Sequence, residues 1–136
     1  MANTIVVTLE QVGPSTSAAR VREHTVLVDR PAAKGGSDRG PMGGELLLTA
    51  LGGCFMSTLL AAIAAREAAL TDVSVEVRGD LEDAPPRFSA VHLFVRATGE
   101  APLLERLVTI AERSCIVANT LRGSVALTLS SEAGPA

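Results

Sequence analysis

The chain has 136 residues, of which 47% are hydrophobic and 20% are charged, and its formal net charge is −3. This length suits one domain with a core of its own, so we expect residues 1–136 to form a single domain. The 12 basic residues are scattered along an acidic chain, which argues against nucleic acid as a partner. The first residues have neither the basic start nor the apolar run of a secretory signal, so we expect a cytoplasmic protein.

The N-terminal part of the chain predicts strands followed by a long loop. Apolar and β-branched residues alternate over residues 4–12 and again over residues 24–28, with a turn-prone Gly-Pro-Ser segment after the first run. These runs predict a hairpin or a meander. Over residues 30–44 the pattern gives way to glycines and prolines, and a loop of this length in a compact domain is usually functional or disordered.

Residues 46–65 contain no charged side chain and are rich in Leu and Ala, which predicts one long helix. Such a segment is long enough to span a bilayer. Its Thr, Gly and Ser residues and its lack of an aromatic belt or basic flank favour instead the buried central helix of a soluble fold, so no membrane is expected as a partner. Gly52 and Gly53 weaken a helix, and we expect them to allow the close approach of another helix.

The C-terminal half predicts a hairpin, a helix and a last strand. Residues 72–81 and 88–97 alternate with period two around a proline-containing turn. Pro102 marks the start of a helix whose apolar residues continue at helical spacing to Cys115, and residues 124–130 form the last strand. The order β-β-helix-β-β-helix-β, without a strand-helix-strand rhythm, predicts an α+β fold with antiparallel sheets.

Cys54 and Cys115 are the candidate reactive residues, because each lies in or at the end of an apolar helix beside small residues. The alternative is that both are buried spectators, since free Cys is among the most buried residue types. His24 and His92 are isolated on predicted strands, so neither a metal site nor a Cys-His pair is expected. We expect no cofactor, because the sequence has no dinucleotide-binding or phosphate-binding motif.

Two separated segments resemble the motifs of the OsmC/Ohr superfamily, the osmotically inducible protein C-like and organic hydroperoxide resistance-like proteins. The first segment runs from Asp29-Arg30-Pro31 through the glycine-rich loop to Gly52-Gly53-Cys54. The second, residues 111–121, is similar to a second Cys motif that usually reads Cys-Pro-x-Ser-Asn, with Ile116 in place of the Pro. The resemblance covers nearly the whole chain. It implies the OsmC-like fold, an intertwined homodimer with two central Cys-bearing helices and the two cysteines close together near the subunit interface.

The resemblance also implies a chemistry. The Cys54 thiolate attacks the distal oxygen of an organic hydroperoxide and becomes a sulfenic acid, and Cys115 condenses with it to a disulfide. An external thiol or dithiol then reduces the disulfide. A thiolate is required for this attack, so the pKa of Cys54 should be lowered by its surroundings.

In the peroxidase branch of the family, an Arg from the N-terminal strands and a Glu at the start of the Cys helix activate the thiol. Arg30 is the first candidate for the Arg, and the others are Arg20, Arg22 and Arg39. Glu45 is the candidate for the Glu, although the family position, ten residues before the first Cys, holds Gly44 in this sequence. The alternative roles are structural: Glu45 would favour the positive end of the helix, and Arg30 would pair with Asp29 or Asp38.

The sequence leaves two functions open. One is a thiol-dependent peroxidase for bulky organic hydroperoxides, with a substrate pocket lined by Leu51, Met42 and Met56. The other is a non-enzymatic small-molecule binder or redox sensor of the same fold, in which both thiols are present but turnover is negligible. In either case we expect an obligate homodimer, because the sheet of one small domain cannot cover a helix that is apolar on all sides.

Overall fold

Three antiparallel strands form a meander near the N-terminus. In the computed structural model, which describes residues 3–135, β1 (Thr8–Gln11) pairs with β2 (Ser17–Val21), and β2 pairs with β3 (His24–Val28). Of the two predicted alternatives, a hairpin or a meander, the structure has the meander, and its central strand β2 was not predicted. Its sequence, Ser-Ala-Ala-Arg-Val, has a single β-branched residue and so gives little strand signal, although Ala18 and Ala19 are buried.

The loop after β3 is held by a buried carboxylate. Asp29 is 3% exposed and accepts hydrogen bonds from the Thr16 hydroxyl at 2.7 Å and from the backbone N–H groups of Arg30 at 2.7 Å and Arg39 at 3.2 Å. Burial raises the pKa of Asp29, but the hydroxyls of Thr16 and Ser15 and these two N–H groups outweigh it and hold the pKa well below its usual value. The loop also contains the short helix η1 (Ala32–Lys34).

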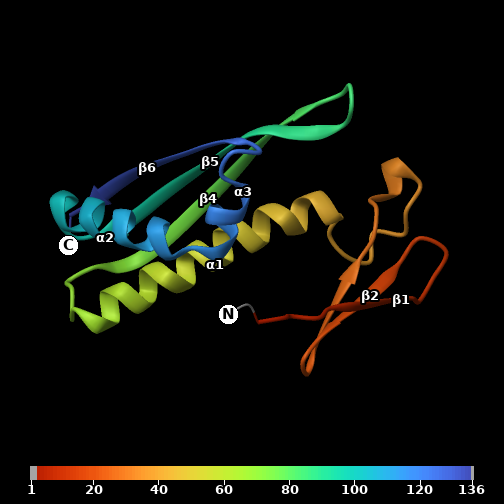
Figure 1. Ribbon diagram of the computed structural model, residues 1–136, viewed down its shortest axis with the longest axis horizontal. Coiled ribbons are helices and arrows are strands. Elements are labelled where there is room, and N and C mark those ends of the chain that lie inside the picture. Colours follow the sequence, from red (N-terminus) through yellow and green to blue (C-terminus); the bar gives the residue numbers. More distant parts are fainter. Residues whose placement is uncertain (1–2, 136) are drawn as a thin grey trace. The chain divides into compact units, whose positions relative to one another are not determined.

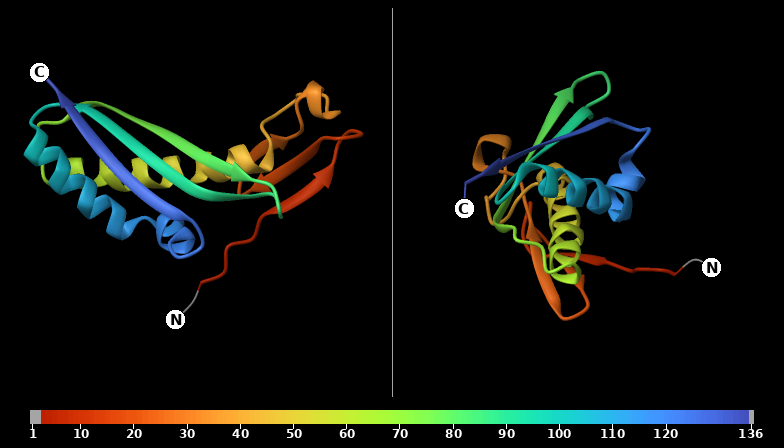
Figure 2. Two further views of the ribbon diagram at one scale, coloured as in Figure 1. Left: turned by 90° about the horizontal axis from the view of Figure 1, so that it is seen from above. Right: turned by 90° about the vertical axis from the view of Figure 1, so that its left-hand side faces the viewer.

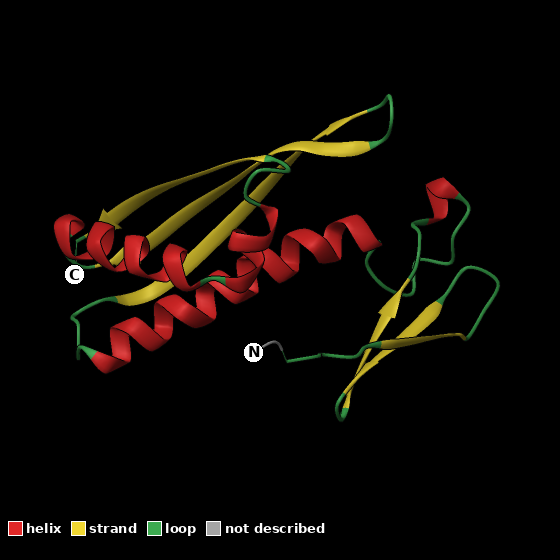
Figure 3. Ribbon diagram, in the orientation of Figure 1, coloured by secondary structure: helices red, strands yellow, loops and turns green. Residues whose placement is uncertain are grey.

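The contacts divide the chain into a first unit, Met1–Leu47, and a second unit, Leu48–Ala136. In the second unit, β4 (Thr71–Glu82) and β5 (Arg87–Thr98) form the predicted antiparallel hairpin, and β6 (Ala126–Gly134) pairs with β5 (Figure 3). This second pairing is parallel, so the prediction of antiparallel sheets is wrong for β6. The helical segment between β5 and β6 is the physical reason: it carries the chain back along the sheet, and such a crossover places consecutive strands parallel.

Three helices cover one face of this sheet (Figures 1 and 2). They are α1 (Gly43–Ala65), which enters the second unit at Leu48, α2 (Ala101–Ser114) and α3 (Ile116–Leu121). The buried core between helices and sheet is aliphatic except for one aromatic ring and one thiol. Its fully buried members are Leu51, Phe55, Leu59, Val91, Leu93, Val95, Leu104, Leu107, Ala111, Cys115 and Ala118.

The long helix α1 buries only one of its faces in its own chain. By length and composition alone the helix could cross a membrane. Within the structure, 28% of its apolar 18-residue segment is buried. A Cβ atom at Gly52 would lie 2.8 Å from Cγ2 of Val77 on β4, whereas a Cβ at Gly53 would meet no atom within 4 Å. The close contact therefore involves a strand and Gly52 alone, and the predicted helix contact at this pair is absent from the chain's own described fold.

Candidate active site

The packing of α2 brings Cys115 into the core of the second unit. Leu104, Leu107 and Ala111 are buried at spacings of three and four residues, and Cys115 continues this spacing with 0% of its surface exposed. The helix itself ends at Ser114, and Cys115 has an extended backbone with φ −80° and ψ 111°. The prediction of two Cys-bearing helices is therefore corrected: Cys115 lies in the break between α2 and α3.

Polar contacts hold the corner at this break. The Asn119 side chain on α3 donates a hydrogen bond to the Arg113 carbonyl at 3.1 Å, which satisfies a carbonyl at the end of α2. Arg122 bonds both Asn119 and the Glu112 carboxylate, the latter at 3.1 Å. These contacts tie the last turn of α2 to α3 and so fix the backbone on both sides of Cys115.

Cys54 lies on α1 at the edge of the buried face, three residues after Leu51 and one before Phe55. It is partly exposed, as expected for a thiol that reacts with an external molecule. One turn later, the Thr58 hydroxyl donates to the Ala111 carbonyl of α2 at 3.2 Å. This hydrogen bond joins the two helices beside the cysteines.

The two thiols contact each other and the first backbone N–H groups of α3. Burial would raise the pKa of Cys54, but hydrogen bonds from the Val117 N–H, the Cys115 thiol and the Ile116 N–H outweigh it and lower this pKa. The Ala118 N–H donates to the Cys115 sulfur at 3.5 Å. The thiolate that this arrangement favours is therefore on Cys54.

The pKa of Cys115 is shifted in the opposite direction. Burial raises the pKa of its thiol, the Ala118 N–H compensates only in part, and the neighbouring Cys54 raises the pKa further. The pKa of the partly exposed thiol is thus lowered, while that of its buried neighbour is raised. A pair of this kind supports attack by the first sulfur on an electrophile and resolution by the second.

A family model described as OsmC-like protein matches residues 35–130. The chain belongs to this family. The two cysteines of this OsmC-like chain lie within the matched segment, as does every helix from α1 to α3. Among curated proteins, none matches the chain.

Solved structures similar to this OsmC-like chain agree on the fold. A hypothetical protein from Aquifex aeolicus VF5 is 19% identical with a TM-score of 0.86, and the match covers 99% of both chains. An OsmC-like protein from Mycoplasma pneumoniae is 16% identical with a TM-score of 0.85, covering 98% of this chain and 99% of the other. The organic hydroperoxide resistance protein OhrB of Bacillus subtilis is 20% identical with a TM-score of 0.71, covering 96% and 98%.

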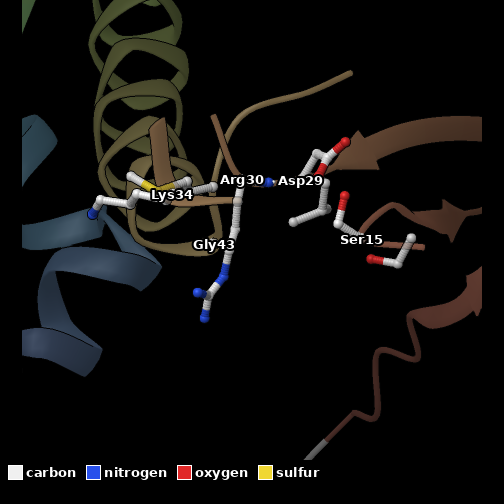
Figure 4. A pocket seen from close by; sticks show the side chains of 8 residues that line it. Ser15, Asp29, Arg30, Lys34 and Gly43 are labelled. Carbon is white, nitrogen blue, oxygen red and sulfur yellow. Dashed lines mark hydrogen bonds between the residues drawn. The ribbon is translucent and has the colours of Figure 1, made fainter. Parts of the chain in front are cut away.

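The predicted activating Arg lies in the first unit of the OsmC-like chain. Arg30 is exposed and lines a cavity of about 420 Å³ together with Ser15, Lys34 and Met42. Figure 4 shows its side chain extending away from that of Asp29, and within residues 3–135 its guanidinium forms no ion pair with Asp29 or Asp38. The structural alternative of such a pair is therefore wrong.

The other candidate arginines also lie in the first unit. Arg20 is paired with Glu10 at 3.4 Å, and the Arg39 side chain donates to the Val12 carbonyl at 3.5 Å. Arg22 is exposed at the turn between β2 and β3 with a left-handed φ of 53°. Arg30 is thus free of the contacts that hold Arg20 and Arg39.

The remaining predicted residues lie on α1. Glu45 is exposed in the first turn of α1, and its carboxylate accepts the Met42 N–H at 2.8 Å, which is the expected contact of an acidic residue at a helix start. Leu51 is fully buried in the core, and Met56 is half-buried on α1. A catalytic role for Glu45 and a substrate pocket at these residues stay predictions.

Sequence reasoning missed the break in the helix at Cys115, which leaves the Ala118 N–H to donate to the Cys115 sulfur. A proline after the Cys, as in the family motif, would have marked the start of a new helix, but this chain has Ile116 there. Among residues 3–135, no cluster of three or more His, Cys, Asp or Glu side chains could hold a metal ion.

Proposed function

We propose that this OsmC-like chain is a thiol-dependent peroxidase that reduces organic hydroperoxides. The observation that carries the proposal is the contact between Cys54 and Cys115, whose pKa values are shifted in opposite directions by their surroundings. A thiolate with a protonated thiol beside it is the arrangement that a two-cysteine peroxidase needs. The structural likeness to proteins named for organic hydroperoxide resistance supports this electrophile.

The reaction proceeds in three balanced steps. The Cys54 thiolate attacks the distal oxygen of the hydroperoxide, the O–O bond breaks, and the alkoxide takes a proton and leaves as the alcohol. The Cys115 sulfur then attacks the Cys54 sulfenic acid, and its proton leaves with the hydroxyl group as water. The raised pKa of Cys115 does not prevent this step, because that proton is consumed in forming the water. Two thiol groups of an external reductant finally reduce the disulfide and are themselves oxidised to a disulfide.

Arg30 and Glu45 stay proposed as activating residues. The Arg30 guanidinium, which is free of ion pairs in the described chain, would further stabilise the thiolate, and Glu45 would orient it. Met56, half-buried on the helix that carries Cys54, would offer an apolar contact to the organic part of the substrate, whereas Leu51 is fully buried and is not open to it. Bulky hydroperoxides should therefore react faster than hydrogen peroxide.

We also propose that the protein is a homodimer. Large apolar side chains are exposed on several elements: Ile5 is 82% exposed, Leu9 57%, Leu60 48% and Ile116 70%. Monomeric soluble proteins rarely expose contiguous apolar patches of more than a few hundred Å². A second copy of this chain would cover these side chains, including the exposed face of α1.

The test is peroxide consumption with cumene hydroperoxide, tert-butyl hydroperoxide and hydrogen peroxide, using dithiothreitol and then a lipoylated protein as the reductant. Cys54→Ser should consume no peroxide and give no sulfenic acid adduct with dimedone. Cys115→Ser should react once and then accumulate sulfenic and sulfinic acid on Cys54. Ser57→Ala, on the exposed face of the same helix, is the matched control and should behave as the wild type.

Mass spectrometry after one equivalent of peroxide completes this test. A Cys54–Cys115 disulfide should form in the wild type alone. Equal loss of the first turnover in both Cys variants would contradict the two-cysteine mechanism. A stoichiometric disulfide without turnover would favour the redox sensor, the function that Gly44 at the family Glu position favours.

A further inference from the structure

A side-chain hydrogen bond joins α1 to α2 one helical turn away from each cysteine. The Thr58 hydroxyl donates to the Ala111 carbonyl at 3.2 Å. Thr58 lies four residues after Cys54 on α1, and Ala111 lies four residues before Cys115. Four residues of a helix rise about 6 Å along its axis, so the bond lies close to the thiol on both segments.

The end of α2 at Ser114 explains why the Ala111 carbonyl takes a donor from another helix. In a continuing helix the Cys115 N–H would bond the Ala111 carbonyl, but here it donates to the Glu112 carbonyl at 3.3 Å. Ala111 is 1% exposed, and a buried carbonyl without a partner is costly. The Thr58 hydroxyl therefore takes the place of the missing helical donor.

The single proton of this hydroxyl has two other acceptors, both on α1. The carbonyl of Phe55 lies at 2.9 Å and that of Cys54 at 3.3 Å. Because α1 continues to Ala65, each of these carbonyls also has the helical N–H four residues later as a donor. The Ala111 carbonyl has lost that donor and so gains most from the hydroxyl.

We propose that Thr58 is a positioning residue for the thiol pair, because its hydroxyl holds the end of α2 against α1 and so keeps Cys115 within reach of Cys54. Cys115 directly follows the last residue of α2, so any shift of that end moves its sulfur. The Asn119 side chain ties α2 to α3, whereas Thr58 ties α2 to the helix of Cys54. This role holds for any oxidant that makes the disulfide, and only its consequence for peroxide turnover rests on the function proposed above.

Two substitutions separate the hydroxyl of Thr58 from the shape of its side chain. Thr58→Val removes the hydroxyl and keeps the β-branched shape, whereas Thr58→Ser keeps the hydroxyl and removes the methyl group. Thr109→Val is the matched control on α2. The Thr109 hydroxyl donates at 3.1 Å to the Glu105 carbonyl of its own helix, so this variant loses a contact within one helix.

The readout is the equilibrium between the reduced protein and its Cys54–Cys115 disulfide in glutathione buffers, quantified by alkylation and mass spectrometry. One oxidised glutathione is converted to two reduced molecules for each protein disulfide formed. In reduced Thr58→Val the end of α2 can relax away from α1, and forming the disulfide reverses this relaxation. The equilibrium constant for disulfide formation should therefore fall roughly two- to tenfold, the range of one hydrogen bond. Thr58→Ser and Thr109→Val should keep the wild-type value.

A purely structural role of Thr58 predicts a different result. It would lower the urea midpoints of the reduced and the oxidised Thr58→Val protein alike and leave the disulfide equilibrium unchanged, and that outcome would overturn the proposal. An equal fall in Thr109→Val, or a wild type that forms no disulfide at any glutathione ratio, would overturn it as well. Thr58→Ala also removes the hydroxyl and should give the same fall, so the test does not depend on the folding of one variant.

Cumene hydroperoxide tests the consequence for turnover. If Cys115 reaches Cys54 more slowly, the sulfenic acid persists longer, so at one excess of peroxide Thr58→Val should carry more sulfinic acid on Cys54 than Thr109→Val. The glutathione measurement contains no peroxide. A shifted disulfide equilibrium combined with an absence of peroxide turnover would therefore contradict the proposed function and leave the role of Thr58 intact, whereas normal turnover with an unchanged equilibrium would overturn the role of Thr58 alone.

Discussion

The contact between Gly52 and Val77 allows the packing of α1 on β4 to be tested with one methyl group. In Gly52→Ala, alanine should favour the helix by about 1 kcal/mol, because glycine disfavours a helix interior by about that amount. The new Cβ would, however, lie 2.8 Å from Cγ2 of Val77, so one of the two elements must move. Overpacking of this kind costs about 1–3 kcal/mol. We expect a net loss of about 1 kcal/mol in the free energy of unfolding, the difference between these two terms.

A double-mutant cycle isolates the contact from helix propensity. Val77→Ala removes the clashing methyl group, so in that background Gly52→Ala should stabilise the protein by about 1 kcal/mol. The coupling between the two substitutions should then be about 1–3 kcal/mol. Urea unfolding at one fixed protein concentration measures all four variants, since the stability of a dimer depends on concentration. Additive effects within about 0.5 kcal/mol would refute the packing argument.

Three further predictions concern the dimer, the disulfide and the first unit. Gly53→Leu should weaken the proposed homodimer without harming the packing of the single chain, because a Cβ there meets no atom within 4 Å, and light scattering that shows an unchanged dimer would contradict this. A limiting monothiol added to the oxidised protein should attack the Cys54 sulfur of the disulfide and form its mixed disulfide there, because Cys115 is 0% exposed. A mixed disulfide mapped to Cys115 would contradict this. Asp29→Asn should lower the urea midpoint, because the amide presents a donor to groups that already donate to Asp29. The pKa of Asp29 is lowered by folding, so its contribution is complete above its unfolded pKa and is lost as the pH falls below about 4. The difference between wild type and variant should shrink in that range, and a constant difference down to pH 3 would speak against it.

The parts of the fold that could be predicted from the sequence are those in which one local pattern extends over many residues. The alternation over residues 72–81 and 88–97 identified β4 and β5 to within one residue at each end, because each strand has one face on the core. The uncharged segment 46–65 likewise identified the part of α1 that carries Cys54. These signals need no knowledge of the partner segment.

The parts that could not be predicted depend on contacts between distant segments. The direction of β6 is set by the crossover through α2 and α3, and an alternating strand has the same pattern whether its neighbour is parallel or antiparallel. The strand β2 is central in its sheet and buries two alanines, whose β propensity is low. The contact of Gly52 with Val77 joins residues 25 positions apart in sequence. A pair of glycines in a helix does not indicate which of the two faces the sheet.

The break in the helix at Cys115 explains why the site combines a backbone feature with two thiols. In an uninterrupted helix, the N–H groups of residues 116–118 would bond the carbonyls four residues earlier and would be unavailable to any sulfur. Because α2 ends at Ser114 and α3 begins at Ile116, these three N–H groups are released at the point where the two cysteines meet. The Ala118 N–H donates to the Cys115 sulfur, and the N–H groups of Val117 and Ile116 favour a lowered pKa at Cys54. The apolar periodicity that the sequence shows through Cys115 places this thiol in the core, while the break in the helix leaves backbone N–H groups available beside the thiols.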